Sequence, residues 1–143
     1  MPNSDTIEFS NITTILLAED DLDDQDFITE ALQQINSSLT IYKVSKGTEV
    51  LPFLNQFSNE QLPQLLILDY NLPEMDGAEV LELLKQNHRF QSITKIMWST
   101  SNSPFYKSRS LQRGATFYLV KPSTIAGIEA MARQMLGLCE ATL

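Results

Sequence analysis

Several chemically reactive side chains of this sequence come directly after short apolar runs. They are three carboxylates, two hydroxyls and one ammonium: Glu19, Asp20, Asp69, Ser99, Thr100 and Lys121. Three carboxylates held close together repel one another, so they either raise the pKa of one of them or hold a cation. A hard divalent ion suits the set best, because it contains no His or Cys that would favour zinc or copper.

The same side chains are suited to phosphoryl transfer. Mg²⁺ usually binds one or two protein carboxylates together with a phosphate oxygen, which leaves a further carboxylate free to react. A carboxylate can act as the nucleophile and form an aspartyl phosphate when the incoming phosphoryl group is neutralised and held in line. Lys121 would then supply a mobile positive charge, and Ser99 a hydroxyl that donates to the phosphoryl oxygens.

These side chains can meet only if the apolar runs are neighbouring strands of one sheet. The apolar and β-branched runs predict five strands, at residues 12–18, 40–44, 65–68, 95–98 and 116–120. Apolar residues at helical spacing predict a helix after each strand, at residues 23–35, 47–57, 78–86, 104–112 and 124–138. This alternation predicts an α/β fold, a doubly wound five-stranded parallel sheet with helices on both faces. In such sheets, ligands bind beyond the carboxyl ends of the strands, where the reactive set lies.

Length and composition argue against several classes of protein. The chain has 143 residues, which suits one domain, and 43% of them are hydrophobic, as in a folded globular protein. Ten Lys and Arg against eighteen Asp and Glu give a formal charge of −8, which argues against binding to nucleic acid. The sequence shows no apolar run of about 20 residues for a membrane span and no signal peptide. A single cysteine, Cys139, cannot form a disulfide framework, so we expect a cytoplasmic protein.

Four segments of the sequence resemble the receiver domains of two-component response regulators. They lie at residues 15–21, 68–77, 99–101 and 120–122, with the sequences ILLAEDD, LDYNLPEMDG, STS and VKP. The resemblance covers roughly residues 12–138, and the acidic opening is particularly similar to single-domain regulators related to those that serve bacterial phytochromes. It implies the flavodoxin-like (βα)5 receiver fold with strand order 2-1-3-4-5. Residues 1–11 would form a flexible lead and residues 139–143 a tail, in a stand-alone receiver or in a fragment of a longer protein.

The resemblance also assigns roles to the acidic residues. Asp69 falls at the position of the phosphoacceptor, and Glu19 and Asp20 fall at those of the metal-binding acids. With Asp69, the backbone carbonyl of Asn71 would complete the protein's ligands for Mg²⁺. An isolated Asp at a strand end usually caps a turn, but the residues that follow Asp69 match the family pattern and favour the nucleophile.

Further residues take roles from the same resemblance. Ser99 corresponds to the switch hydroxyl and is preferred over its neighbour Thr100 because it directly ends the strand. Lys121 corresponds to the lysine that pairs with the phosphoryl group, and Tyr118 to the aromatic residue whose rotamer reports activation. Family members commonly have a cis peptide before the following proline, so the Lys121–Pro122 peptide is expected to be cis.

The resemblance implies a phosphorelay protein with Mg²⁺ as its cofactor. Its phosphoryl donor would be a sensor histidine kinase or a histidine phosphotransfer protein, and the receiver itself would catalyse transfer and later hydrolysis. Such a protein is a signalling switch rather than an enzyme that turns over an external substrate. Its output would pass to a downstream protein target, or to a second copy, through the surface of residues 104–112, 116–120 and 124–138. The polar sequence of residues 104–112 is typical of a mobile element.

Alternative interpretations remain open. One concerns further acids that follow the first strand. An exposed helix face is their preferred interpretation, and a role as ligands is the alternative: Asp21, Asp23, Asp24 and Asp26. The chain could be a degenerate receiver that only binds partners, although the intact set of acid, hydroxyl and lysine argues against this. It could be a flavin-binding electron carrier of the same fold, but the acids after the first strand would repel a flavin phosphate. A phosphatase with an aspartate nucleophile would need a second acid two positions after Asp69, where Asn71 stands.

Overall fold

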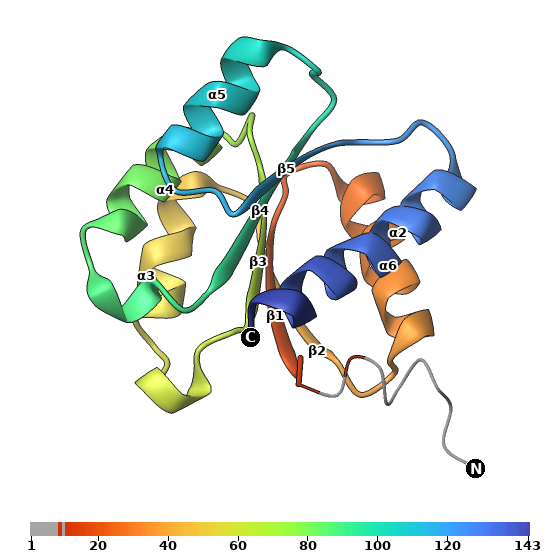
Figure 1. Cartoon of the computed structure of the whole chain (residues 1–143), viewed down its shortest axis with the longest axis horizontal. Helices are drawn as coiled ribbons and strands as arrows, with labels where there is room; N and C mark the ends of the chain where they lie inside the picture. The colour runs from red at the N-terminus through yellow and green to blue at the C-terminus, as the bar shows by residue number, and fades with distance from the viewer. Residues whose placement is uncertain (1–8, 10) are drawn as a thin grey trace.

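Five parallel strands form the centre of the molecule. The computed structural model describes residues 9 and 11–143, and Figure 1 shows their arrangement. The strands are β1 (Thr14–Ala18), β2 (Thr40–Val44), β3 (Leu65–Asp69), β4 (Thr94–Ser99) and β5 (Phe117–Val120). They pair in the order β2-β1-β3-β4-β5, and every neighbouring pair is parallel. The predicted strand order 2-1-3-4-5 is therefore confirmed.

Helices cover both faces of this sheet. The α-helices are α2 (Leu22–Ile35), α3 (Val50–Leu54), α4 (Gly77–Lys85), α5 (Pro104–Gln112) and α6 (Ile125–Thr142), and short 3₁₀ turns lie at Gly47–Glu49, Asn59–Gln61 and His88–Phe90. In Figure 1, α2 and α6 lie on one face of the sheet, and α3, α4 and α5 lie on the other. This is the predicted doubly wound α/β fold. None of the helices in the described part of the chain is both long and apolar enough to cross a membrane.

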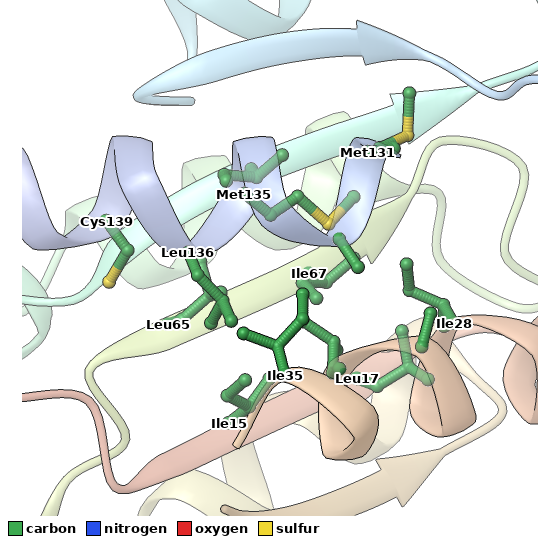
Figure 2. Packing of buried hydrophobic residues seen from close by; sticks show 14 of the residues in the cluster. Ile15, Leu17, Ile28, Ile35, Leu65, Ile67, Met131, Met135, Leu136 and Cys139 are labelled. Carbon is green, nitrogen blue, oxygen red and sulfur yellow. The ribbon is translucent and has the colours of Figure 1, made fainter. Parts of the chain in front are cut away.

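The central strands are covered on both faces. Every residue of β3 and β4 is buried, whereas the edge strands β2 and β5 are partly exposed. Such burial is typical of a parallel sheet between two helical layers. Because alternate residues point to opposite faces, Ile15 and Leu17 of β1 join the cluster beneath α2 and α6, and Leu16 and Ala18 join the cluster beneath α3 and α4. Figure 2 shows the first cluster, where side chains of α6 meet those of β1, β3 and α2.

Both ends of the chain depart from the expected pattern. α6 continues to Thr142, so the expected tail at residues 139–143 is wrong. Cys139 lies on the buried stripe of this helix and is fully buried in the cluster beneath α2 and α6. Phe9, in the expected N-terminal lead, is also buried in that cluster. Of the rest of the lead, residues 1–8 and 10 lie outside the described part of the chain.

Candidate functional site

The carboxyl ends of the strands open into a hollow lined largely by acids. β1 and β3 are neighbours in the sheet, but the chain leaves β1 toward β2 on one side and returns to β3 on the other. Such a change of direction opens a crevice at the carboxyl edge of an α/β sheet. The hollow there has a volume of about 630 Å³, and its lining includes Glu19, Asp20, Asp24, Asp69 and Lys121. The structure therefore brings the reactive strand ends together.

Three carboxylates at this edge lie close enough together to hold one cation. Glu19, Asp20 and Asp69 each offer one oxygen, and these oxygens lie within 4.8 Å of one another. Glu19 and Asp69 are buried, while Asp20 is exposed. All of these donors are oxygens, which suits a hard divalent cation better than zinc or copper.

Backbone contacts fix Glu19 at the end of β1. Its N–H donates to the carbonyl of Val44 at 3.0 Å, which extends the pairing of β1 with β2 by one residue. Its Oε2 accepts a hydrogen bond from the N–H of Asp21 at 3.1 Å, and its carbonyl accepts one from the side-chain amide of Gln25. The carboxylate of Asp21 in turn caps α2 by accepting the N–H of Asp24 at 2.9 Å. The first turn of α2 is thereby tied to the strand end that carries Glu19.

Asp69 is held in place by the turn that follows β3. Its Oδ1 accepts a hydrogen bond from the N–H of Asn71 at 3.4 Å, and the N–H of Tyr70 donates to the carbonyl of Trp98 at 3.3 Å. Gly77 begins α4 so close to Asp69 that a Cβ there would lie 2.6 Å from the Asp69 carbonyl oxygen. A residue with a side chain would force the backbone apart, which explains why glycine stands at this position.

The ammonium of Lys121 lies among three carboxylates. Its Nζ is 2.8 Å from Oε1 of Glu19, 3.0 Å from Oδ2 of Asp24 and 3.5 Å from Oδ1 of Asp69. It also lies 4.8 Å from the centre of the Trp98 ring, which is a cation–π distance. The lysine side chain is only 9% exposed, so these contacts form largely out of water. Lys121 is therefore the positive partner of both buried acids of the site.

The peptide between Lys121 and Pro122 is trans, since the structure contains no cis peptide bond within residues 11–143. The predicted cis peptide is therefore wrong. Trans is favoured by about 0.5–1 kcal/mol before proline, and the local pairing is compatible with it. The N–H of Lys121 donates to the carbonyl of Ser99 at 2.7 Å and continues the pairing of β5 with β4, while the lysine side chain reaches the acids.

Burial changes the ionisation of the charged groups in the site. It raises the pKa of Glu19 to about 8, although the hydrogen bond from Lys121 acts in the opposite direction. Burial also raises the pKa of Asp69, against the effect of the positive charge of Lys121. For Lys121, burial acts to lower the pKa, but the hydrogen bond to Glu19 and the charge of Asp69 outweigh it and raise the pKa. The site thus holds more carboxylate than one lysine neutralises, and a bound cation would supply the missing charge.

The predicted switch residues both contact the loop after β4. Ser99 is fully buried, and its Oγ accepts a hydrogen bond from the N–H of Ser101 at 3.1 Å. The hydroxyl of Tyr118 donates to the carbonyl of the same Ser101 at 2.6 Å. Thr100 lines the hollow, whereas Ser99 does not. If its hydroxyl turned toward the hollow, Ser99 would lose the hydrogen bond from the N–H of Ser101.

Two charged contacts near the site are not foreseen from the sequence. Asp24 is expected on an exposed helix face, whereas the structure places its carboxylate against Lys121. Its position on the first turn of the helix that follows the strand-end acids is a signal that it shares with Asp23, so the sequence does not single it out. Arg109 of α5 donates to the hydroxyl of Tyr70 at 2.7 Å and to Oδ2 of Asp76 at 3.1 Å. No comparable signal in the sequence marks Arg109.

The family model for the response regulator receiver domain matches residues 15–133. Among curated proteins, the chain is similar to response regulator Rcp1 of Synechocystis sp. (strain ATCC 27184 / PCC 6803 / Kazusa), with 30% identity over 122 residues that cover 83% of each chain. It is also similar to the two-component response regulators ARR8 and ARR9 of Arabidopsis thaliana, with 29% and 30% identity over 85% of this chain. The chain spans only 60% of the length of ARR8 and 58% of that of ARR9.

Solved structures share the fold over most of the chain. The crystal structure of the phosphorylated cyanobacterial phytochrome response regulator RcpA has a TM-score of 0.83 and 27% identity, and the match covers 92% of this chain and 96% of RcpA. The Mn²⁺-bound form of Rcp1 has a TM-score of 0.72 and 29% identity, and the match covers 85% of this chain and 90% of Rcp1. The first of these proteins is phosphorylated, and the second binds a divalent metal ion.

Proposed function

Because this chain belongs to the response regulator receiver domain family of two-component signalling, we propose that it is a phosphorylation switch whose phosphoacceptor is Asp69. The position of the Asp69 carboxylate carries the proposal. It is buried at the carboxyl end of β3, and it offers an oxygen within 4.8 Å of oxygens of Glu19 and Asp20. Nζ of Lys121 lies 3.5 Å from its Oδ1. This arrangement surrounds the nucleophile with the groups that neutralise an incoming phosphoryl group.

The phosphoryl donor is a phosphohistidine of a sensor histidine kinase or of a histidine phosphotransfer protein. A carboxylate oxygen of Asp69 attacks the phosphorus as the phosphorus–nitrogen bond of the donor breaks, and the donor nitrogen keeps the electron pair of that bond. Lys121 is in position to pair with the phosphoryl oxygens, since its Nζ already lies beside the acceptor. The hollow of about 630 Å³ above the acids leaves room for the donor to approach.

The acids of the site fit Mg²⁺ as the cofactor. Glu19, Asp20 and Asp69 would hold the ion through carboxylate oxygens, together with the backbone carbonyl of Asn71. Burial raises the pKa of Glu19 to about 8, and a cation bound beside it would favour its charged form. When bound, the ion neutralises the oxygens of the transferring phosphoryl group. The Mn²⁺-bound structure of Rcp1 supports a divalent ion at a site of this kind.

The switch follows from contacts of the loop after β4. Phosphorylation adds negative charge and hydrogen-bond acceptors next to this loop. When the Ser99 hydroxyl turns toward the phosphoryl group, its hydrogen bond with the N–H of Ser101 breaks. Ser101 is then held less firmly, and its carbonyl is the partner of the Tyr118 hydroxyl. The change biases two pre-existing conformations of the surface formed by α5, β5 and α6. This surface then contacts a downstream protein target or a second copy.

Intact-mass spectrometry tests the proposed function. Native protein incubated with acetyl phosphate and Mg²⁺ is expected to gain one phosphoryl group, and the gain is expected to disappear in EDTA and in Asp69→Asn. Asp26→Asn, which changes an exposed acid of α2, is the matched control and is expected to gain the group as the native protein does. A phosphoryl gain that persists in Asp69→Asn would place the acceptor elsewhere. The absence of any gain in folded native protein would favour a degenerate receiver that only binds partners.

A further inference from the structure

Lys121 has a carboxylate partner outside the group of acids that could share a cation. That group contains Glu19, Asp20 and Asp69, whose oxygens lie within 4.8 Å of one another. Asp24 does not belong to it, yet its Oδ2 is 3.0 Å from Nζ of Lys121, which is closer than the 3.5 Å between Nζ and Oδ1 of Asp69. The contact joins the first turn of α2 to the residue after β5, across 97 positions of the sequence.

A cation among the acids would change the balance of these contacts. The cation would attract the negative charges of Glu19 and Asp69. It would repel the ammonium of Lys121, because the cation and the ammonium would be positive charges a few ångströms apart. Two of the three carboxylates around the lysine are therefore weakened as partners when the site is ready for phosphoryl transfer. The charge of Asp24 stays available to the lysine.

The backbone of α2 holds Asp24 in this position. The Asp21 carboxylate accepts the N–H of Asp24 at 2.9 Å, and the Asp21 carbonyl accepts the N–H of Gln25 at 3.0 Å. The side-chain amide of Gln25, which is buried, donates to the carbonyl of Glu19. The turn that carries Asp24 is therefore fixed relative to the end of β1.

We propose that Asp24 is a positioning residue for Lys121, one that keeps the ammonium beside Asp69 while a cation occupies the neighbouring acids. This inference rests on the phosphorylation switch proposed above and adds a further carboxylate to it. A lysine held in this way is already ordered before the phosphoryl group arrives, so the barrier of the transfer step does not include the entropy cost of ordering its side chain. Asp24 therefore acts on the rate of phosphorylation rather than on the affinity for the cation.

The rate of phosphorylation by acetyl phosphate in saturating Mg²⁺ tests this role. We expect Asp24→Asn to be phosphorylated about tenfold more slowly than the native protein, with an affinity for Mg²⁺ that changes by less than about threefold. Asp26→Asn removes the same charge from an exposed position of the same helix and is expected to keep the native rate. Asp24→Glu keeps the carboxylate and is expected to recover part of the rate. A native rate in Asp24→Asn, or an equal loss in Asp26→Asn, would overturn the proposal.

A double-mutant cycle separates positioning of the lysine from structural support. If Asp24 acts through Lys121, adding Asp24→Asn to Lys121→Ala slows phosphorylation no further. Independent losses in the two variants that multiply in the double variant would show that Asp24 acts by another route. The thermal unfolding midpoint of each variant accompanies the rates and shows that the proteins compared are folded.

A measurement on the ammonium itself separates this inference from the proposed function. In nitrogen NMR spectra recorded with Mg²⁺ and without a phosphodonor, we expect native protein to show a slowly exchanging Lys121 ammonium signal that Asp24→Asn loses. If the signals behave in this way but native protein takes up no phosphoryl group, the proposed function fails, and only the positioning of the Lys121 ammonium by Asp24 stands, without an effect on phosphorylation. A signal that survives in Asp24→Asn, or that native protein lacks in Mg²⁺, contradicts the role of Asp24.

Discussion

The helices α6 and α5, on opposite faces of the sheet, are attached to it by different kinds of contact. On one face, α6 packs a stripe of buried side chains against β1, β3 and α2 (Figure 2): Met131, Met135, Leu136 and Cys139. On the other face, α5 buries only Ser110. Two of its large apolar residues, Phe105 and Leu111, are 66% and 43% exposed. The apolar contact that fixes α6 is therefore largely missing from α5.

Polar and aromatic contacts near Asp69 replace this apolar packing in α5. Arg109 donates to the hydroxyl of Tyr70, the residue after Asp69, at 2.7 Å, and to Oδ2 of Asp76 at 3.1 Å. The ring of Tyr106 stacks on that of Tyr70, with centroids 4.4 Å apart. Contacts of this kind can be exchanged without exposing a large apolar surface, so α5 can move at a lower free energy than α6. The comparison supports a switch in which α6 is the scaffold and α5 is the mobile element.

A cavity beneath α6 should have the largest effect on stability. Leu136→Ala truncates a fully buried side chain of α6, and we expect it to lower the free energy of unfolding by about 2–5 kcal/mol. Leu111→Ala truncates the same kind of side chain on the exposed part of α5 and should lower it by less than about 1 kcal/mol. Urea unfolding of both variants measures the difference. Equal losses would remove the distinction between α6 and α5.

The buried acids, unlike the apolar packing of α6, should make stability depend on pH. In metal-free protein the folded-state pKa of Glu19 is about 8, against an ordinary value of 4.5, so between these values the folded state binds a proton that the unfolded state releases. The free energy of unfolding should therefore fall as pH rises from about 4.5 to about 8, by on the order of 1 kcal/mol per pH unit. Affinity for Mg²⁺ should rise over the same range, because binding displaces the proton.

Urea unfolding in EDTA at a series of pH values measures this dependence. Glu19→Gln cannot ionise at this position and should flatten the slope, whereas Leu136→Ala should lower stability at every pH and keep the slope. A free energy of unfolding that rises across this range in native protein would contradict the raised pKa of Glu19.

The central scaffold is predictable because burial on both faces of a strand leaves a recognisable apolar run. The run at residues 65–68 and the Asp69 that ends it mark β3 to within one residue. The end of α6 is harder to predict, because Gly137 is a poor helix former and residues 140–142 add no large apolar side chain to the stripe. The helix continues there because its last turns pack against the sheet, and this packing cannot be inferred from the local sequence.

The strand-end acids of the site are predictable for a topological reason. Parallel strands bring their carboxyl ends to one edge, so Glu19 and Asp69 meet regardless of the details of the helices. Asp24 is different, because several acids on the first turns of α2 have similar sequence surroundings, and the rotation of the helix selects the one that reaches Lys121. Arg109 depends in addition on how α5 lies over the start of α4.

Release of α5 should have a moderate effect that is confined to this helix. Arg109→Ala removes the contacts with Tyr70 and Asp76, and because the side chain is 25% exposed we expect a loss of about 1 kcal/mol in the free energy of unfolding. Amide hydrogen exchange should become about fivefold faster in α5 and stay unchanged in α6. Arg113→Ala, which removes a longer contact of 3.9 Å with Glu82, is the control and should leave exchange in α5 near the native rate. Equal acceleration in α6 would show that α5 and α6 are coupled.

Removal of the Tyr118 hydroxyl should have the smallest effect on the free energy of unfolding. Tyr118→Phe removes the hydrogen bond to the carbonyl of Ser101 and leaves the ring, so we expect a loss of about 0.5–1 kcal/mol in the free energy of unfolding. Ser101 also donates its N–H to Ser99, so exchange should become faster at residues 99–103 and stay unchanged in α6. Tyr42→Phe, on the edge strand β2, is the control. Native exchange at residues 99–103 in Tyr118→Phe would mean that Ser99 alone holds this loop, and the tyrosine would then have no part in passing the signal to α5.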